Sequence, residues 1–162
     1  MFIRVKKRQG KKSVNYYAYL VNNKWTRYLP KQKVSLYLGP YFKLEKISNI
    51  ISDLNKVKKE NLFHFILKNE LLNHEFKDEG NWLFTHEKGF KVNLKTKSVF
   101  NKNKKICLGV NQGYLCNYTL KKLISFKLKT KEDSKNLIKI MIEVGFNPDK
   151  DLFIEIFNKI LP

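Results

Sequence analysis

The first forty-four residues alternate between apolar and polar positions in short runs. Residues 3–6 alternate, residues 33–38 alternate strictly, and residues 16–21 are rich in aromatic and β-branched side chains. A period of two is typical of strands that bury one face. The pattern therefore predicts a three-stranded antiparallel meander over residues 1–44.

The same alternation predicts which side chains of the meander face the core. The apolar positions of the second and third runs would point inward, and they are Ala18, Leu20, Val34, Leu36 and Leu38. The side chains between them would point outward with the basic residues of the strands. The outward aromatic positions are Tyr17, Tyr19 and Tyr37.

Beyond residue 44 the apolar spacing becomes helical and then returns to alternation. Apolar residues recur every three or four positions over 45–76, which predicts a central helix. Residues 82–110 alternate again and predict a second β-hairpin region, followed by a short helix at 118–126. Residues 77–81 read as a loop.

The C-terminal segment carries helix boundary signals. Thr130 and Asp133 resemble a capping box, which predicts a helix over 131–144 that ends at Gly145. Asn147-Pro148 then suits the start of a helix over 148–160. The two helices would form a helical hairpin.

These elements predict a small α+β protein with an N-terminal three-stranded antiparallel meander, a central helix, a second β-hairpin region and a C-terminal helical hairpin. Residues 1–44 would form a basic β module and residues 45–162 an α+β region. A chain of 162 residues also allows both parts to form one compact domain.

The distribution of charge along the chain gives information about the binding partner. The net charge is +19, and residues 1–44 contain 11 basic and no acidic residues. Residues 81–131 hold 12 basic residues and one acid, Glu87, whereas residues 45–80 and 132–162 are nearly balanced. Codon bias would act on all four segments alike. Self-repulsion on this scale favours a polyanionic partner.

Other classes of protein are disfavoured by the composition. The apolar runs are far shorter than the ~20 residues of a membrane-spanning helix, and the N-terminus becomes charged at once, so we expect neither membrane span nor secretory signal. Cys107 and Cys116 are too few for a disulfide scaffold or a zinc site. The sequence predicts a cytoplasmic protein.

The candidate nucleic-acid-binding residues are basic and aromatic side chains on the predicted strands and turns. In the β module they are Arg4, Lys6, Tyr17, Tyr19, Trp25, Arg27, Lys31, Lys33 and Tyr37, with Tyr28 beside them. Lysines contact phosphates, and tyrosines stack on bases or pack on sugars. In the second β region we expect mainly phosphate contacts, from Lys91, Lys95, Lys104 and Lys105. Lys121, Lys122, Lys127, Lys129 and Lys131 extend that basic region.

Catalytic and metal-binding patterns are weak, and we expect no cofactor, no metal and no catalysis. His64 lies among apolar residues, and His74, Glu75, Asp78 and Glu79 cluster at a predicted helix end. Glu75-Phe76-Lys77 matches a three-residue fragment of nuclease cores but lacks a placed upstream Asp. A small nuclease is therefore the enzymatic alternative.

The N-terminal motifs resemble a known strand module. Phe-Ile-Arg-Val-Lys at 2–6, Tyr-Tyr-Ala-Tyr-Leu-Val at 16–21 and Lys-Gln-Lys-Val-x-x-Tyr-Leu-Gly at 31–39 are similar to the N-termini of some insertion-sequence transposases and of uncharacterised basic archaeal proteins. The resemblance covers about a quarter of the chain. It implies a nucleic-acid-associated module. It does not imply a transposase, because no spaced triad of acids is recognisable in the rest of the sequence.

The sequence thus predicts a non-catalytic nucleic-acid-binding protein that uses basic, tyrosine-bearing β surfaces. RNA, or a ribonucleoprotein particle, is favoured because lysines with scattered tyrosines suit irregular phosphate arrays. A DNA-binding accessory protein of a mobile element or of a replication or recombination system is the alternative. A protein partner that docks on the helices also stays open.

Overall fold

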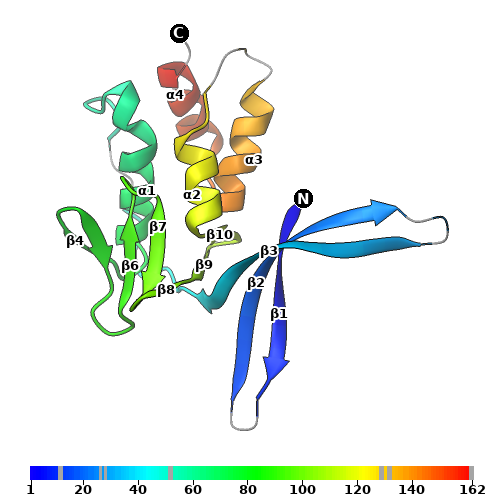
Figure 1. Cartoon of the computed structure of the whole chain (residues 1–162). Coiled ribbons are helices and arrows are strands. Elements are labelled where there is room, and N and C mark those ends of the chain that lie inside the picture. Colours follow the sequence, from blue (N-terminus) through cyan, green and yellow to red (C-terminus); the bar gives the residue numbers. More distant parts are fainter. Residues whose placement is uncertain are drawn as a thin grey trace.

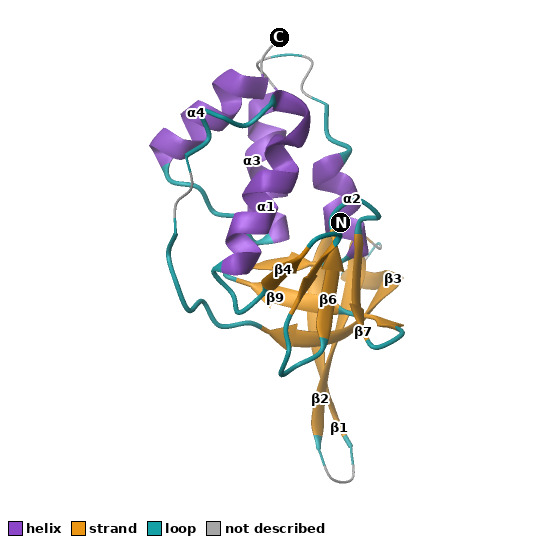
Figure 2. Ribbon diagram, turned by 90° about the vertical axis from the view of Figure 1, so that its left-hand side faces the viewer, coloured by secondary structure: helices purple, strands orange, loops and turns teal. Residues whose placement is uncertain are grey.

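The computed structural model describes residues 1–10, 13–25, 27, 29–50, 53–127, 130 and 133–160. It confirms the α+β class: the N-terminal meander and the C-terminal helices are present. Figures 1 and 2 show the helices gathered at one end of the molecule, while the N-terminal hairpins project from the strands at the other end. No helix within the described ranges is long and apolar enough to cross a membrane.

The first sheet joins the meander to a later hairpin. Its order is β1-β2-β3-β9-β10, and its strands are β1 (Phe2–Gln9), β2 (Val14–Trp25), β3 (Pro30–Lys43), β9 (Cys107–Val110) and β10 (Gly113–Leu115). β1, β2 and β3 pair antiparallel, as predicted, whereas β3 pairs with β9 in parallel through residues 41–43. The last part of β3 therefore ties the N-terminal strands to the rest of the protein.

A small core lies where the strands of the meander meet the later hairpin, and we call this place the crossing point of the meander. The small core is formed by Ile3, Ala18, Leu20, Leu38, Cys107 and Cys116. Ala18, Leu20 and Leu38 therefore face the core as the alternation predicted. Gly39 allows β3 to bend there: its φ is +117°, and a Cβ at this position would overlap the Lys105 carbonyl oxygen.

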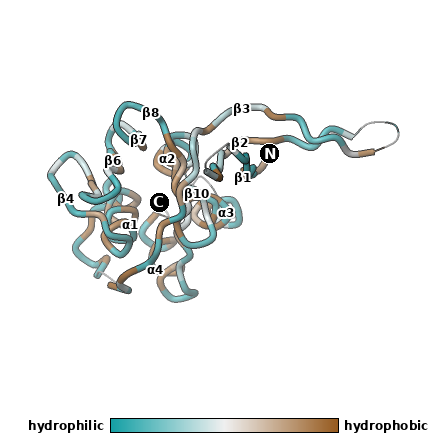
Figure 3. The backbone as a smooth tube through the Cα atoms, turned by 90° about the horizontal axis from the view of Figure 1, so that it is seen from below, coloured by the Kyte–Doolittle hydropathy of each residue, from teal (hydrophilic) through white to brown (hydrophobic). Residues whose placement is uncertain are grey.

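Val34 and Leu36 are not buried as predicted, because their side chains are 42% and 48% exposed. Leu36 keeps the face of Leu20, which lies directly opposite, whereas Val34 lies opposite Val21 on the face of Tyr19, so the inward assignment of Val34 was wrong. The register of β2 and β3 shifts between Ala18 and Tyr19 and again between Leu20 and Val21. Each bulge changes the phase of the alternation. This part of the hairpin also extends beyond the core, as a ribbon in which hydrophobic and hydrophilic segments alternate (Figure 3).

The second sheet contains most of the predicted second β region over 82–110, whereas β9 at the end of that region joins the first sheet. The order of the second sheet is β4-β5-β6-β7-β8, with β4 (Lys77–Glu79), β5 (Trp82–Phe84), β6 (Phe90–Asn93), β7 (Ser98–Asn101) and β8 (Lys104–Lys105), all antiparallel. The predicted loop at 77–81 is wrong in part, because residues 77–79 form β4. One face of this sheet packs on the main core through Leu83, Val92 and Val99.

The predicted central helix over 45–76 was wrong over half its length. Residues 53–58 contain no helix, and the helical part comprises η1 (Lys59–Asn61) and α1 (Leu62–Leu72). Ile47 and Ile50, which completed the apolar stripe, are exposed. Ser, Asn and Asp side chains in this segment compete with helix formation by bonding to nearby backbone groups.

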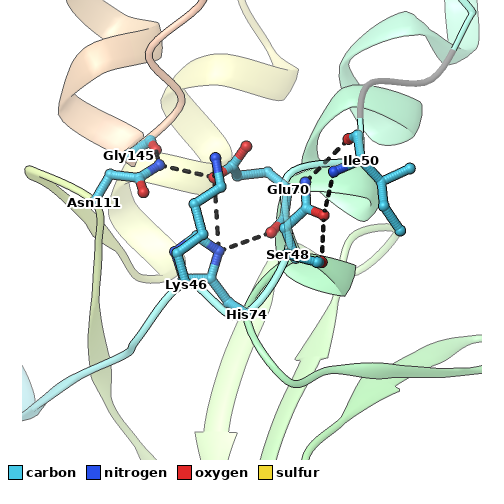
Figure 4. A network of polar contacts seen from close by, with 8 residues as sticks. Lys46, Ser48, Ile50, Glu70, His74, Asn111 and Gly145 are labelled. Atoms are coloured by element: carbon cyan, nitrogen blue, oxygen red, sulfur yellow. Dashed lines mark hydrogen bonds and ion pairs between the residues drawn. The ribbon is translucent and has the colours of Figure 1, made fainter.

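Asn73 holds this non-helical segment against the end of α1. Its side-chain oxygen accepts hydrogen bonds from Ser48 Oγ (2.7 Å) and from the Ile50 N–H (2.9 Å), and its amide donates to the Ile50 carbonyl (3.1 Å). Glu70, one turn earlier, accepts from Asn111 (2.8 Å) and lies 3.6 Å from Lys46 (Figure 4). This polar network replaces the hydrogen bonds that a helix would have supplied.

The C-terminal helices follow the predicted order with shifted starts. They are α2 (Asn117–Ile124), α3 (Ser134–Val144) and α4 (Lys150–Ile160). α3 ends at Gly145 with φ +106°, as the glycine predicted. α4 begins after Asp149, whose carboxylate accepts from the Leu152 N–H (2.8 Å), so the predicted cap at Asn147 was wrong by two residues. Residues 131 and 132 of the predicted third helix lie outside the described residues.

Candidate nucleic-acid interface

One face of the meander carries cations and tyrosines in register. Arg4 lies directly opposite Tyr19, and Lys6 lies opposite Tyr17. Across the other side of β2, Tyr37 lies opposite Tyr19. Arg8 follows on the same face of β1, because residues two apart in a strand share a face. We call Arg4, Lys6, Arg8, Tyr17, Tyr19 and Tyr37 the basic tyrosine face.

The side chains of this face contact one another. The ring centroids of Tyr19 and Tyr37 are 5.3 Å apart, and those of Tyr17 and Tyr37 are 6.3 Å apart. Lys6 Nζ lies 5.4 Å from the Tyr19 centroid, and the Arg8 guanidinium lies 5.8 Å from that of Tyr17. These are cation–π distances. The prediction that the three tyrosines share the face of Arg4 and Lys6 is confirmed.

The surroundings of Tyr37 favour its protonated hydroxyl. Burial raises the pKa of Tyr37, and the neighbouring Tyr19 and Tyr17 raise it further against the opposing effect of Arg8. Tyr37 nevertheless remains 52% exposed, and Tyr17 and Tyr19 are half-buried. The three rings therefore present partly accessible surfaces beside cations, without a carboxylate anywhere in residues 1–44.

Lys31 and Lys33 do not join this face, which corrects the prediction. They lie opposite Lys24 and Asn22, whose side chains alternate with those of the odd-numbered residues of β2. The bond from Arg4 to Gln32 supports this assignment, since Gln32 is the residue between the two lysines. Both lysines are exposed on the other side of the hairpin.

The outer end of the β2–β3 hairpin carries the remaining candidates of the module. Trp25, at the end of β2, is 83% exposed, and Arg27 lies exposed in the connection to β3. Figure 1 shows this hairpin end far from the helices. Tyr28 lies outside the described residues. The structure therefore separates these side chains from the basic tyrosine face.

The second sheet separates the other predicted lysines. Lys91 and Lys105 lie on its outer face, directly opposite Phe100 in both cases. Lys104 lies opposite Asn101, and Lys95 lines a hollow of about 760 Å³ beside η1 and α1. Aromatic side chains adjoin these lysines as well, because Trp82, Phe84 and Phe100 accompany Lys91 around a hollow of about 480 Å³. The signal was in the sequence: Phe84 and Phe100 adjoin Leu83 and Val99, which take the core face.

A further hollow lies between the two sheets. It has a volume of about 770 Å³ and is lined by Tyr16, Tyr41 and Phe42 together with Lys43 and Lys88.

Of the additional lysines of the predicted basic region, the three that the structure describes do not line these hollows. Lys122 pairs with Glu143, and Lys121 and Lys127 are exposed. Lys129 and Lys131 lie outside the described residues.

Several titratable groups outside these surfaces have structural partners. His74 Nδ1 lies 2.8 Å from the Glu70 carbonyl oxygen, and Glu75 accepts from Lys88 (2.7 Å). Asp78 pairs with Lys68, which lowers the pKa of that carboxyl. Within the described ranges, no group of three or more His, Cys, Asp and Glu side chains is placed to hold a metal ion.

The pKa values of two further groups, His64 and Cys107, are shifted. The pKa of His64, at the hollow beside α1, is lowered chiefly because burial disfavours its charged form. Cys107 and Cys116 are free and buried, and hydrogen bonding to Cys116 together with burial raises the pKa of the Cys107 thiol. Both cysteines belong to the small core under the meander.

No known protein family, curated protein or solved structure matches this chain.

Proposed function

We propose that this protein binds nucleic acid through the basic tyrosine face of its N-terminal strands. The observation that carries the proposal is the register of β1, β2 and β3, which sets three cations beside three tyrosine rings. Cations at this spacing contact successive phosphates, and the rings offer stacking surfaces for bases or sugars. The absence of acids in residues 1–44 leaves no local charge that repels a phosphate backbone.

The proposed ligand is RNA, alone or within a ribonucleoprotein particle. A sheet face with tyrosines suits unpaired bases, which are splayed out in RNA loops and single strands. Duplex DNA is usually read by a helix in the major groove. α3 and α4, by contrast, are nearly balanced in charge, with Asp149 directly before α4 as a further acid. Their basic residues are Lys135, Lys139, Lys150 and Lys159, and their acidic residues are Glu143, Asp151 and Glu155.

Binding of labelled single-stranded RNA, single-stranded DNA and duplexes by fluorescence anisotropy tests the proposal. Affinity should fall steeply with salt, with a log–log slope of several units, because several phosphates are neutralised. The double variant Arg4→Ala/Lys6→Ala should lower the slope by roughly 1.5, since each phosphate contact contributes about 0.7–0.9.

The matched control is Lys135→Ala/Lys139→Ala, which removes the same charge from exposed positions on α3. This control should bind almost as the unmodified protein does. Absence of binding at low salt contradicts the proposal. A larger loss in the α3 variant than in the β1 variant places the binding surface elsewhere. Tighter binding to duplex DNA than to single-stranded RNA overturns the choice of RNA.

A further inference from the structure

The outer face of the second sheet carries an alternating row of lysine and phenylalanine. Lys77 lies opposite Phe84, Phe84 opposite Lys91, Lys91 opposite Phe100, and Phe100 opposite Lys105. The row thus crosses β4, β5, β6, β7 and β8 in order. Directly opposed residues have Cβ atoms about 5 Å apart. We call these five residues the Lys–Phe row.

The phenylalanines of this row are not needed by the core behind the sheet. The core face is filled by Leu83, Val92 and Val99, which are fully buried. Phe84 and Phe100 lie on the other face, where each is half-buried and flanked by lysines. Lys91 Nζ lies 5.3 Å from the Phe84 centroid. A purely solvated face would not require aromatic rings at both positions.

The row lines a hollow that can hold a flat ring. Trp82, Phe84, Lys91, Phe100 and Lys102 surround an open volume of about 480 Å³. Pockets of about 300–1,000 Å³ bind small organic groups. One acid, Glu79, lies at the Trp82 end of the hollow, where it pairs with His86 at 3.3 Å. The row itself contains only cations and rings.

From this geometry we infer that the Lys–Phe row is a stacking platform for an unpaired stretch of RNA. Aromatic faces stack on bases of any identity, and interleaved cations neutralise the phosphates between them. Bases inside a duplex do not expose their faces, so a duplex gains only the phosphate contacts. The inference rests on the proposed function for its ligand, but it assigns a second surface and a distinct chemistry.

The position of the row connects it with the basic tyrosine face. Its last residue, Lys105, has its carbonyl oxygen against Gly39 of β3, two residues beyond Tyr37. The hollow lined by Tyr41, Phe42 and Lys43 lies between the sheets on the same part of β3. A single RNA chain could therefore contact both surfaces in succession.

Tryptophan fluorescence tests the platform directly. The chain contains two tryptophans, so Trp25→Phe leaves Trp82 as the reporter beside the hollow. A short oligouridine should quench Trp82 emission through stacking, and an RNA duplex should not. In this background, Phe84→Leu/Phe100→Leu should weaken oligouridine binding about tenfold or more, the loss expected of a stacked base. Duplex affinity should stay unchanged.

The controls separate failure of the platform from failure of the proposed function. Leucine keeps apolar bulk at both positions, and far-UV circular dichroism checks the fold; Lys91→Gln, a surface change, should weaken oligouridine binding less. If the double leucine variant binds oligouridine normally while Arg4→Ala/Lys6→Ala does not, the platform is wrong and the proposed function stands. If only the leucine variant loses binding, the platform stands and the N-terminal site is wrong. If the protein binds no RNA at all, both the platform and the proposed function are wrong.

Discussion

The N-terminal meander and the second sheet are both antiparallel, basic and aromatic, yet they are supported in opposite ways. The three central strands of the second sheet, β5, β6 and β7, pack on the main core through Leu83, Val92 and Val99. The meander has a small core only at its crossing point, where Ala18, Leu20 and Leu38 meet the two cysteines. Beyond that point its hairpins project as two-stranded ribbons (Figures 1 and 2).

The comparison teaches where alternation can be trusted. Where a strand has a core behind it, a slip of one residue exposes apolar side chains, so the pattern and the burial agree. A projecting ribbon has no such constraint. In β3 the first bulge, beside Ala18, leaves Leu38 in the small core, whereas at the second, beside Leu20 and Val21, the small core ends and Leu36 and Val34 are exposed. Isolated ribbons are only marginally stable, so the ribbons here depend on their attachment to the body.

The largest effect is expected at that attachment. Gly39→Ala should lower the free energy of unfolding by about 4 kcal/mol, because a strained φ and an overlap with a backbone carbonyl each contribute about 1–3 kcal/mol. Its φ of +117° and the Lys105 carbonyl are the causes. Gly80→Ala is the matched control: its φ is +75°, and nothing lies within 4 Å of an added Cβ.

The control should lose only about 1 kcal/mol, as expected of backbone strain without overlap. Urea denaturation followed by circular dichroism measures both values. Equal losses in the two variants would mean that β3 does not pack on β8 as described. The supported and the projecting parts of the molecule would then be less coupled than the comparison implies.

Much of the fold follows from the sequence because most elements bury one face. The strands at 82–110 were predicted for this reason, and the end of α3 was predicted from Gly145. Residues 45–50 and 53–58 were misread because the isoleucines recur at helical spacing although Ile47 and Ile50 are exposed; residues 51 and 52 lie outside the described part of the chain. What decides that segment is a distant amide, Asn73, which periodicity does not register.

The second-largest loss of stability is expected at Leu38, in comparison with Leu36 on the same strand. Leu38→Ala should cost about 3 kcal/mol, because its side chain is only 8% exposed and its removal leaves a cavity in the small core. Leu36→Ala, at 48% exposure, should cost less than about 1 kcal/mol. Thermal unfolding of both variants measures the difference. Comparable losses would show that the outer ribbon is covered in solution.

The candidate site was predicted correctly only where the alternation within one uninterrupted strand decides which face a side chain takes. Tyr17 and Tyr19 were placed correctly because Ala18 and Leu20 lie between and beside them in the same uninterrupted stretch of β2. Lys31 and Lys33 were misplaced because a bulge separates them from Tyr37. The row on the second sheet depends on the pairing of five strands, which no local pattern specifies.

A smaller effect distinguishes stacking from packing on the basic tyrosine face. If RNA bases stack there, Tyr19→Ala should weaken RNA binding by about 1–3 kcal/mol. If Tyr19 only packs on Lys6 and Tyr37, binding should hardly change while stability falls by about 0.2–1 kcal/mol, the range of cross-strand pairs. Tyr19→Phe, which keeps the ring, should retain binding. Anisotropy titrations and denaturation curves on the three proteins separate the two cases.

The smallest effect concerns the two faces of the β2–β3 ribbon. Lys31→Ala/Lys33→Ala and Arg4→Ala/Lys6→Ala remove equal charge, but the register places the first pair on the face opposite the tyrosines. Only contacts with phosphate contribute about 0.7–0.9 each to the salt slope, because a distant lysine acts through screened charge alone. The Lys31/Lys33 variant should therefore keep nearly the full slope and lose less affinity than the Arg4/Lys6 variant, with the difference shrinking as salt rises. Equal slopes for the two variants would mean that RNA wraps around the ribbon, and the basic tyrosine face would then be one side of a larger binding surface.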